Sequence, residues 1–132
     1  GVHAATDVTG FGLLGHLRNV CAASGVSARV FVDQVPVLAA ARTYVAEGIA
    51  PGGTHANWRF LADWVTWGEG VGKDEQLLLA DAQTSGGLLI AVAPERAGAL
   101  VAALNRLGTP AAAVVGEIFQ GPSGRMEITR SR

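Results

Sequence analysis

The sequence predicts a single α/β domain of the α+β kind, in which helices pack on a mixed sheet. Segments with apolar residues at helical spacing alternate along the chain with short segments rich in valine, and such helices cover the strands between them. The 132 residues can form one hydrophobic core and no more. Hydrophobic residues make up 49% of the chain and charged residues 16%, a balance that excludes an intrinsically disordered protein.

The first predicted helix covers residues 12–23, where apolar side chains recur at helical spacing. Thr9 is the expected N-cap, and the pair Ser24 and Gly25 is expected to end the helix. A strand is predicted over residues 26–32, because valine and alanine alternate there with other residue types.

A second helix is predicted over residues 37–47, with Gly48 as its stop. From residue 49 to residue 72, glycines and a proline interrupt every periodic pattern, so this stretch is interpreted as a long irregular segment. It contains all three tryptophans. We expect part of it to be mobile or to be covered by a neighbouring molecule, since exposed apolar patches commonly mark interaction surfaces.

The second half of the chain contains the remaining predicted helices and strands. They are a short helix over 74–80, a buried strand over 88–92, a helix over 94–107 that stops at Gly108, and strands over 111–118 and 126–129. The two last strands are separated by a turn rich in glycine.

Charge and cysteine content exclude several classes of function. Ten basic residues against eleven acidic ones give a net charge of −1, and this lacks the basic excess of a nucleic-acid-binding module. The single cysteine, Cys21, excludes a disulfide framework and is predicted to be a small buried residue. No segment is long and apolar enough to suggest a membrane span or a signal peptide. A cytoplasmic protein without nucleic-acid or membrane partners is therefore expected.

Two segments place one carboxylate among hydroxyls and glycines, namely Thr6–Gly12 and Asp81–Gly87. Glycines allow backbone N–H groups to converge on phosphate oxygens, and a lone aspartate in such a turn can bind Mg²⁺. The alternative is that these residues only cap helices. Neither segment matches a Walker A loop or a dinucleotide-binding fingerprint.

Three motifs in order give the chain a specific resemblance. They are Thr6–Leu17, Pro51–Thr54 together with Asn57, and Asp81–Leu89, followed by the short match Gly116–Ile118. Over essentially its whole length the chain resembles the C-terminal domain of selenophosphate synthetases, also called selenide, water dikinases. It departs from the family at Ala82, where proline is common, and this exchange is expected to loosen the turn without removing a ligand.

The resemblance implies a fold and a place in a larger protein. The fold is the one shared with the C-terminal domain of aminoimidazole ribonucleotide synthetase, a layered α/β/α sandwich with a mixed sheet and partial ferredoxin-like topology. Residues 1–132 are then the C-terminal domain, and the catalytic, ATP-binding N-terminal domain is not contained in this sequence.

The resemblance also implies a reaction, in which ATP, selenide and water give selenophosphate, AMP and orthophosphate in the presence of Mg²⁺. Asp7 takes the role of a metal ligand, and no catalytic residue is expected in this chain. The wall of the nucleotide-side cleft is expected to include Thr9, Gly10, Gly12, Thr84, Ser85 and Gly86. The implied partners are the protein's own N-terminal domain, the substrates ATP and selenide, and a second subunit in a homodimer of the full-length protein. The isolated chain is expected to be inactive.

Two alternatives stay open at this point. The first is another ATP-dependent member of the same superfamily, such as aminoimidazole ribonucleotide synthetase or thiamine-phosphate kinase. The second is a binding or regulatory module without catalysis. For His16, which follows the first glycine motif, a structural hydrogen bond is favoured over a role as a metal ligand.

Overall fold

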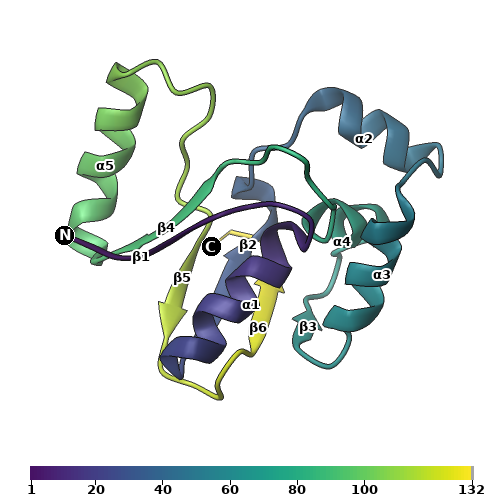
Figure 1. Cartoon of the computed structure of the whole chain (residues 1–132), viewed down its shortest axis with the longest axis horizontal. Helices are drawn as coiled ribbons and strands as arrows, with labels where there is room; N and C mark the ends of the chain where they lie inside the picture. The colour runs from purple at the N-terminus through teal and green to yellow at the C-terminus, as the bar shows by residue number, and fades with distance from the viewer. Residues whose placement is uncertain (132) are drawn as a thin grey trace.

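The computed structural model describes residues 1–131, which form a mixed α/β arrangement. In chain order the elements are β1 (Val2–Asp7), α1 (Gly12–Ser24), β2 (Ser27–Phe31), the short 3₁₀ helix η1 (Val32–Gln34), α2 (Ala39–Ala46), α3 (Gly52–Leu61), β3 (Val65–Trp67), α4 (Lys73–Leu79), β4 (Leu88–Val92), α5 (Pro94–Arg106), β5 (Gly116–Phe119) and β6 (Met126–Thr129). Figure 1 shows α5 at one end of the molecule and α2, α3 and α4 at the other.

The main sheet has four strands in the order β3-β6-β2-β5. Strand β6 runs parallel to β2 and to β3, whereas β5 runs antiparallel to β2, so the sheet is mixed as predicted. Ala28 lies opposite Met126 and Val30 lies opposite Ile128. Because side chains alternate across a strand, these four apolar residues share one face of the sheet.

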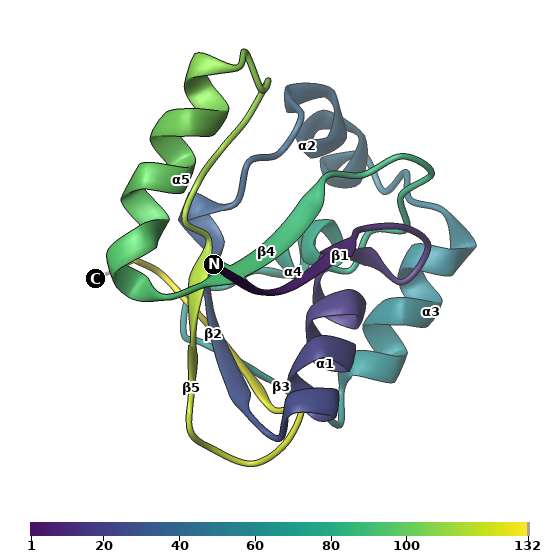
Figure 2. The same ribbon diagram turned by 60° about the vertical axis from the view of Figure 1, so that its left-hand side comes forward.

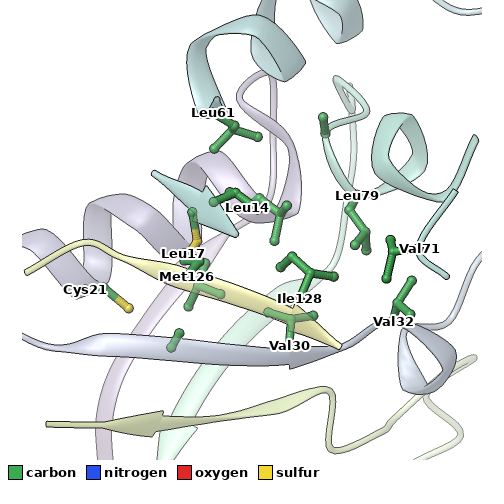
Figure 3. Close-up of a cluster of buried hydrophobic side chains, with 13 residues drawn as sticks. Leu14, Leu17, Cys21, Val30, Val32, Leu61, Val71, Leu79, Met126 and Ile128 are labelled. Carbon is green, nitrogen blue, oxygen red and sulfur yellow. The ribbon is translucent and has the colours of Figure 1, made fainter. Parts of the chain in front are cut away.

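The hydrophobic core lies between this face and α1. Leu14, Leu17 and Cys21 of α1 are buried and point toward Met126 and the neighbouring sheet residues (Figure 3). The helix ends at Gly25, whose φ of 67° is the left-handed conformation expected of a glycine C-cap. Cys21 is 0% exposed within the core cluster, which confirms the prediction of a small buried residue, and this burial raises the pKa of its thiol.

Strands β1 and β4 form a separate antiparallel pair. Strand β4 has the predicted bounds, but the prediction that it is buried was wrong, because Leu88 is 71% exposed and its other residues are half-buried. A continuous apolar run shows that a strand is favoured, and it does not show whether both of its faces are covered. Strand β1 was missed, because its alanines give little strand signal and its pairing partner is distant in sequence.

The interpretation of residues 49–72 as a long irregular segment was wrong, because this stretch contains α3 and β3. Pro51 precedes the helix, and Gly52 and Gly53 occupy only its first turn. A glycine costs about 1 kcal/mol in a helix interior, and these two lie at the very start of the helix. Burial of Leu61, which is 0% exposed, offsets this cost.

The three tryptophans belong to the protein's own core and not to an open loop. All are partly buried against the core cluster. The Trp58 indole N–H donates to Oε1 of Gln76 at 2.9 Å, and the Lys73 ammonium lies 3.6 Å from the Trp58 ring centre. The Arg18 guanidinium stacks 4.0 Å from the centre of the Trp64 ring. The indoles thus contact the protein's own core, whereas Ile49 and Phe60 of the same stretch are more than half exposed, and coverage of part of it by a neighbouring molecule stays a prediction.

Other boundaries differ in smaller ways. The helix predicted over 37–47 spans Ala39–Ala46. The strand predicted over 111–118 spans only Gly116–Phe119, although Val114 and Val115 directly before it have high strand propensity. None of the helices within residues 1–131 has the length and apolar character needed to cross a bilayer.

An ion pair between Arg130 and Glu75 connects the segment after β6 to α4. Because Glu75 titrates, this pair is expected to make the stability of the protein depend on pH. Nη1 of Arg130 lies 2.7 Å from Oε1 of Glu75. The hydrogen bonding from Arg130 holds the pKa of the Glu75 carboxyl below its usual value of 4.5. The stabilisation is therefore present above pH 4.5 and is lost as the pH falls through the lowered pKa of the folded state.

We expect Glu75→Gln to lower the melting temperature at pH 7 by no more than about 3 °C, since the pair is partly exposed and screened by salt. The difference from the unmodified chain should shrink as the pH is lowered below 4.5. Thermal melts between pH 7 and pH 3 measure this difference. A gap that stays constant across this range would contradict the assigned cause.

Candidate functional site

The two segments that stand out in the sequence lie side by side. The turn between β1 and α1, residues 8–11, contacts the turn between α4 and β4, residues 80–87. The Val8 N–H donates to the Gly87 carbonyl at 2.9 Å, and the Gln83 N–H donates to the Thr9 carbonyl at 3.1 Å. Figure 2 shows both turns near α3, on the side of the molecule away from α5. The two segments therefore adjoin, which is what the expectation of one cleft wall built from both of them requires.

Two glycines allow this close approach. A Cβ atom on Gly86 would lie 2.3 Å from the Val8 carbonyl oxygen, so no side chain fits there. Gly12 has a φ of 71°, and a Cβ atom on it would lie 2.8 Å from backbone atoms of Ala80 and Asp81. By contrast, a Cβ atom on Gly10 would meet nothing within 4 Å. The first two positions therefore need glycine to bring the backbones together.

Side chains of helix α3 form hydrogen bonds with both turns. The side-chain amide of Asn57 donates to the carbonyls of Gly10 and Ala80, at 2.8 and 3.0 Å. The buried hydroxyl of Thr54 donates to Oδ1 of Asp81 at 2.6 Å and accepts the N–H of Ala82 at 3.1 Å. The sequence motif contained both residues, but their role was missed. Their spacing becomes informative only when residues 52–61 are known to be helical.

Ala82 makes a contact that a proline could not make. Its N–H donates to the Thr54 hydroxyl, and proline has no N–H at this position. The exchange that was expected to loosen the turn therefore adds a hydrogen bond that ties the turn to α3.

Asp7 lies at the end of β1, opposite Leu88 of β4. Its carboxylate is exposed and, among residues 1–131, makes no hydrogen bond or ion pair with another side chain. This leaves its oxygens available to a cation, and Mg²⁺ is commonly held by one or two carboxylates together with waters and substrate phosphates. Within the described residues no three His, Cys, Asp or Glu side chains gather into a set that could hold a metal ion. An exposed carboxylate without a side-chain partner is compatible with the predicted metal-ligand role of Asp7, and that role stays a prediction.

Thr9 does not cap α1, which corrects the prediction from the sequence. The N-cap residue is Phe11, without a side-chain hydrogen bond to the helix. Instead, Oγ1 of Thr9 shares a hydrogen bond with Nε2 of His16 at 3.0 Å, and the Phe11 ring lies 5.7 Å from the imidazole. The prediction of a structural hydrogen bond for His16 is confirmed. The Thr9 hydroxyl is therefore engaged within the protein.

The other expected cleft residues lie on the two turns. Gly10, Thr84 and Ser85 are exposed, and Gly86 is half-buried beside Val8. Gly12 is buried beneath the junction, where its role is to let the backbones approach. The structure brings these residues to one side of the molecule, and their binding roles stay predictions.

Comparison with known proteins agrees with the motifs. The family described as "AIR synthase related protein, C-terminal domain" matches residues 1–129. The chain belongs to this family. The mixed α/β architecture described above is the fold expected from the resemblance, so both the family and the fold class are confirmed.

Curated relatives of this AIR synthase related domain include several selenide, water dikinases. One from Pelobacter propionicus is 46% identical over 127 residues, which are 96% of this chain and 36% of the relative. One from Burkholderia orbicola is 44% identical over 123 residues, or 93% of this chain and 35% of the relative. One from Photorhabdus laumondii is 44% identical over 131 residues, covering 97% of this chain and 36% of the relative. The chain thus spans about a third of the length of these relatives.

Proposed function

We propose that this chain acts as the C-terminal domain of a selenide, water dikinase. The observation that carries the proposal is the 46% identity to a protein of that name over 96% of the chain. The adjoining turns and the available carboxylate of Asp7 support it, since phosphoryl transfer depends on positioning and on neutralising phosphate charge.

In this proposal the chain supplies one wall of a nucleotide-side cleft. The carboxylate of Asp7 holds Mg²⁺ together with ligands from outside this chain. Bound Mg²⁺ would neutralise charge on the phosphates of ATP. Gly10, Thr84 and Ser85 are exposed on the two adjoining turns, and their exposed backbone N–H and hydroxyl groups are proposed to bind polar groups of the substrate.

The remaining parts of the reaction are assigned to the rest of a longer protein. Since the relatives are about three times as long as the matched region, we propose that an N-terminal domain supplies the catalytic residues and most of the ATP site. That domain is the proposed direct partner of this chain, and the complete protein is proposed to form a homodimer.

Selenide-dependent formation of AMP from ATP tests this function. We expect the full-length protein to form AMP and selenophosphate when ATP, Mg²⁺ and selenide are present, and the isolated chain to form neither. Phosphorus NMR distinguishes AMP, orthophosphate and selenophosphate in one sample. Full-length protein that hydrolyses ATP without any dependence on selenide would contradict the proposal. Comparable turnover by the isolated chain would contradict the assignment of catalytic residues to the N-terminal domain.

A further inference from the structure

Asn57 joins two turns that are far apart in sequence. Its Nδ2 amide has two hydrogens, and it donates to the Gly10 carbonyl at 2.8 Å and to the Ala80 carbonyl at 3.0 Å. Ala80 is 0% exposed, so its carbonyl needs a partner within the protein. One side chain thus satisfies an acceptor on each of the two turns.

The helix that carries Asn57 is held by buried contacts. Asn57 projects from α3, which is anchored in the core by the fully buried Leu61 (Figure 3). One helical turn earlier, the 1% exposed Thr54 binds both Asp81 and the Ala82 N–H, so the second turn is held at two further points. The first turn has only Asn57 as a side-chain contact from α3 among the described hydrogen bonds. Loss of Asn57 would therefore release the first turn more than the second.

We propose that Asn57 is a positioning residue, which sets the place of the turn after Asp7 relative to the turn that contains Thr84 and Ser85. It touches neither metal nor substrate and acts through the Gly10 carbonyl. This role rests on the proposed function, because Asp7 must meet the phosphates of ATP at a defined distance from the second turn. Groups that orient a metal ligand through hydrogen bonds commonly change metal affinity 10–100-fold when they are removed.

The first arm of the test uses the isolated chain and needs no activity. Asn57→Asp keeps the size of the side chain but places carboxylate oxygens against two carbonyl oxygens. We expect the Gln83 amide, which donates to Thr9 across the junction, to exchange its hydrogen at least about tenfold faster. Amides of the core strand β6 should exchange as before. Asn19→Asp, on the exposed side of α1, is the matched control and should leave Gln83 unchanged.

Unchanged exchange at Gln83 in Asn57→Asp would overturn the proposal. If Asn57→Asp fails to fold, Asn57→Ser, which introduces no carboxylate, is measured in its place. Faster exchange at Gln83 with unchanged exchange in β6 is again the expected result. Asn57→Gln keeps the two donor hydrogens on a longer side chain. In this variant we expect the Gln83 amide to regain part of its protection from exchange.

The second arm uses the full-length protein. We expect Asn57→Asp to raise the Mg²⁺ concentration for half-maximal AMP formation about tenfold, with a smaller change in kcat at saturating Mg²⁺. A purely structural residue would lower the amount of folded enzyme and leave the Mg²⁺ requirement unchanged, and this outcome would overturn the positioning role. Unmodified full-length protein without selenide-dependent AMP formation would instead overturn the proposed function, while the exchange arm still decides whether Asn57 holds the junction.

Discussion

Asp7→Asn is expected to lower selenide-dependent AMP formation by the full-length protein at least about 100-fold, a loss of about 2.7 kcal/mol or more of transition-state stabilisation. The substitution keeps the size of the side chain but removes the negative charge, and a neutral amide is a poor ligand for Mg²⁺. Because the Asp7 side chain is exposed and makes no hydrogen bond or ion pair within residues 1–131, the melting temperature of the variant should stay within about 2 °C of that of the unmodified protein.

The control for this substitution is Asp63→Asn. Asp63 is another exposed aspartate, in the connection between α3 and β3 and outside the two turns. The same change of charge there should leave AMP formation within about twofold of the unmodified protein. Assays at several Mg²⁺ concentrations separate metal binding from later steps. Full activity of Asp7→Asn with an unchanged Mg²⁺ requirement would show that Asp7 is not a metal ligand.

Gly12→Ala is expected to be strongly destabilising, because the added methyl group meets both backbone strain and a close backbone contact at the junction. Alanine at a φ of 71° costs about 1–2 kcal/mol, and its Cβ would lie 2.8 Å from backbone atoms of Ala80 and Asp81. Backbone cannot move aside as a flexible side chain can, so we expect a total loss of roughly 3 kcal/mol. For a chain of this size that lowers the melting temperature by roughly 10 °C.

Gly10→Ala is the matched control, only two positions earlier on the same turn. Its φ is not positive, and the added Cβ meets nothing within 4 Å. Thermal or urea unfolding of the two variants measures the difference directly. We expect Gly10→Ala to change stability by less than about 1 kcal/mol in either direction. Equal destabilisation of both variants would mean that the junction is not closed as described.

Several features of this protein follow from its sequence alone. Helical spacing of leucines and a glycine stop give α1 within one residue of its predicted end, and Pro94 marks the start of α5. The ordered glycine-rich motifs identify the family, because such backbone-dependent turns tolerate few other residues. They also point to Asp7 and the turn at residues 84–86 as neighbours, and the hydrogen bonds between the two turns agree with this.

Other features depend on contacts between residues that are distant in sequence. The glycines in the first turn of α3 made its sequence look irregular, and only the packing of Leu61 and the indoles against the core shows why a helix is stable there. Strand β1 exists because β4 pairs with it, and the exposure of Leu88 depends on which faces of that pair are covered.

Within the candidate site, the roles of Thr9 and Asn57 also depend on contacts between residues that are distant in sequence. A threonine before a helix and an asparagine inside an unassigned segment have many possible hydrogen-bond partners, and local sequence does not choose among them. Tertiary structure places His16 beside Thr9, and it brings the carbonyls of Gly10 and Ala80 within reach of Asn57. The sequence by itself determined which residue types the two turns contain. Folding alone decided which of them touch, because hydrogen bonds require the right distance and direction in space.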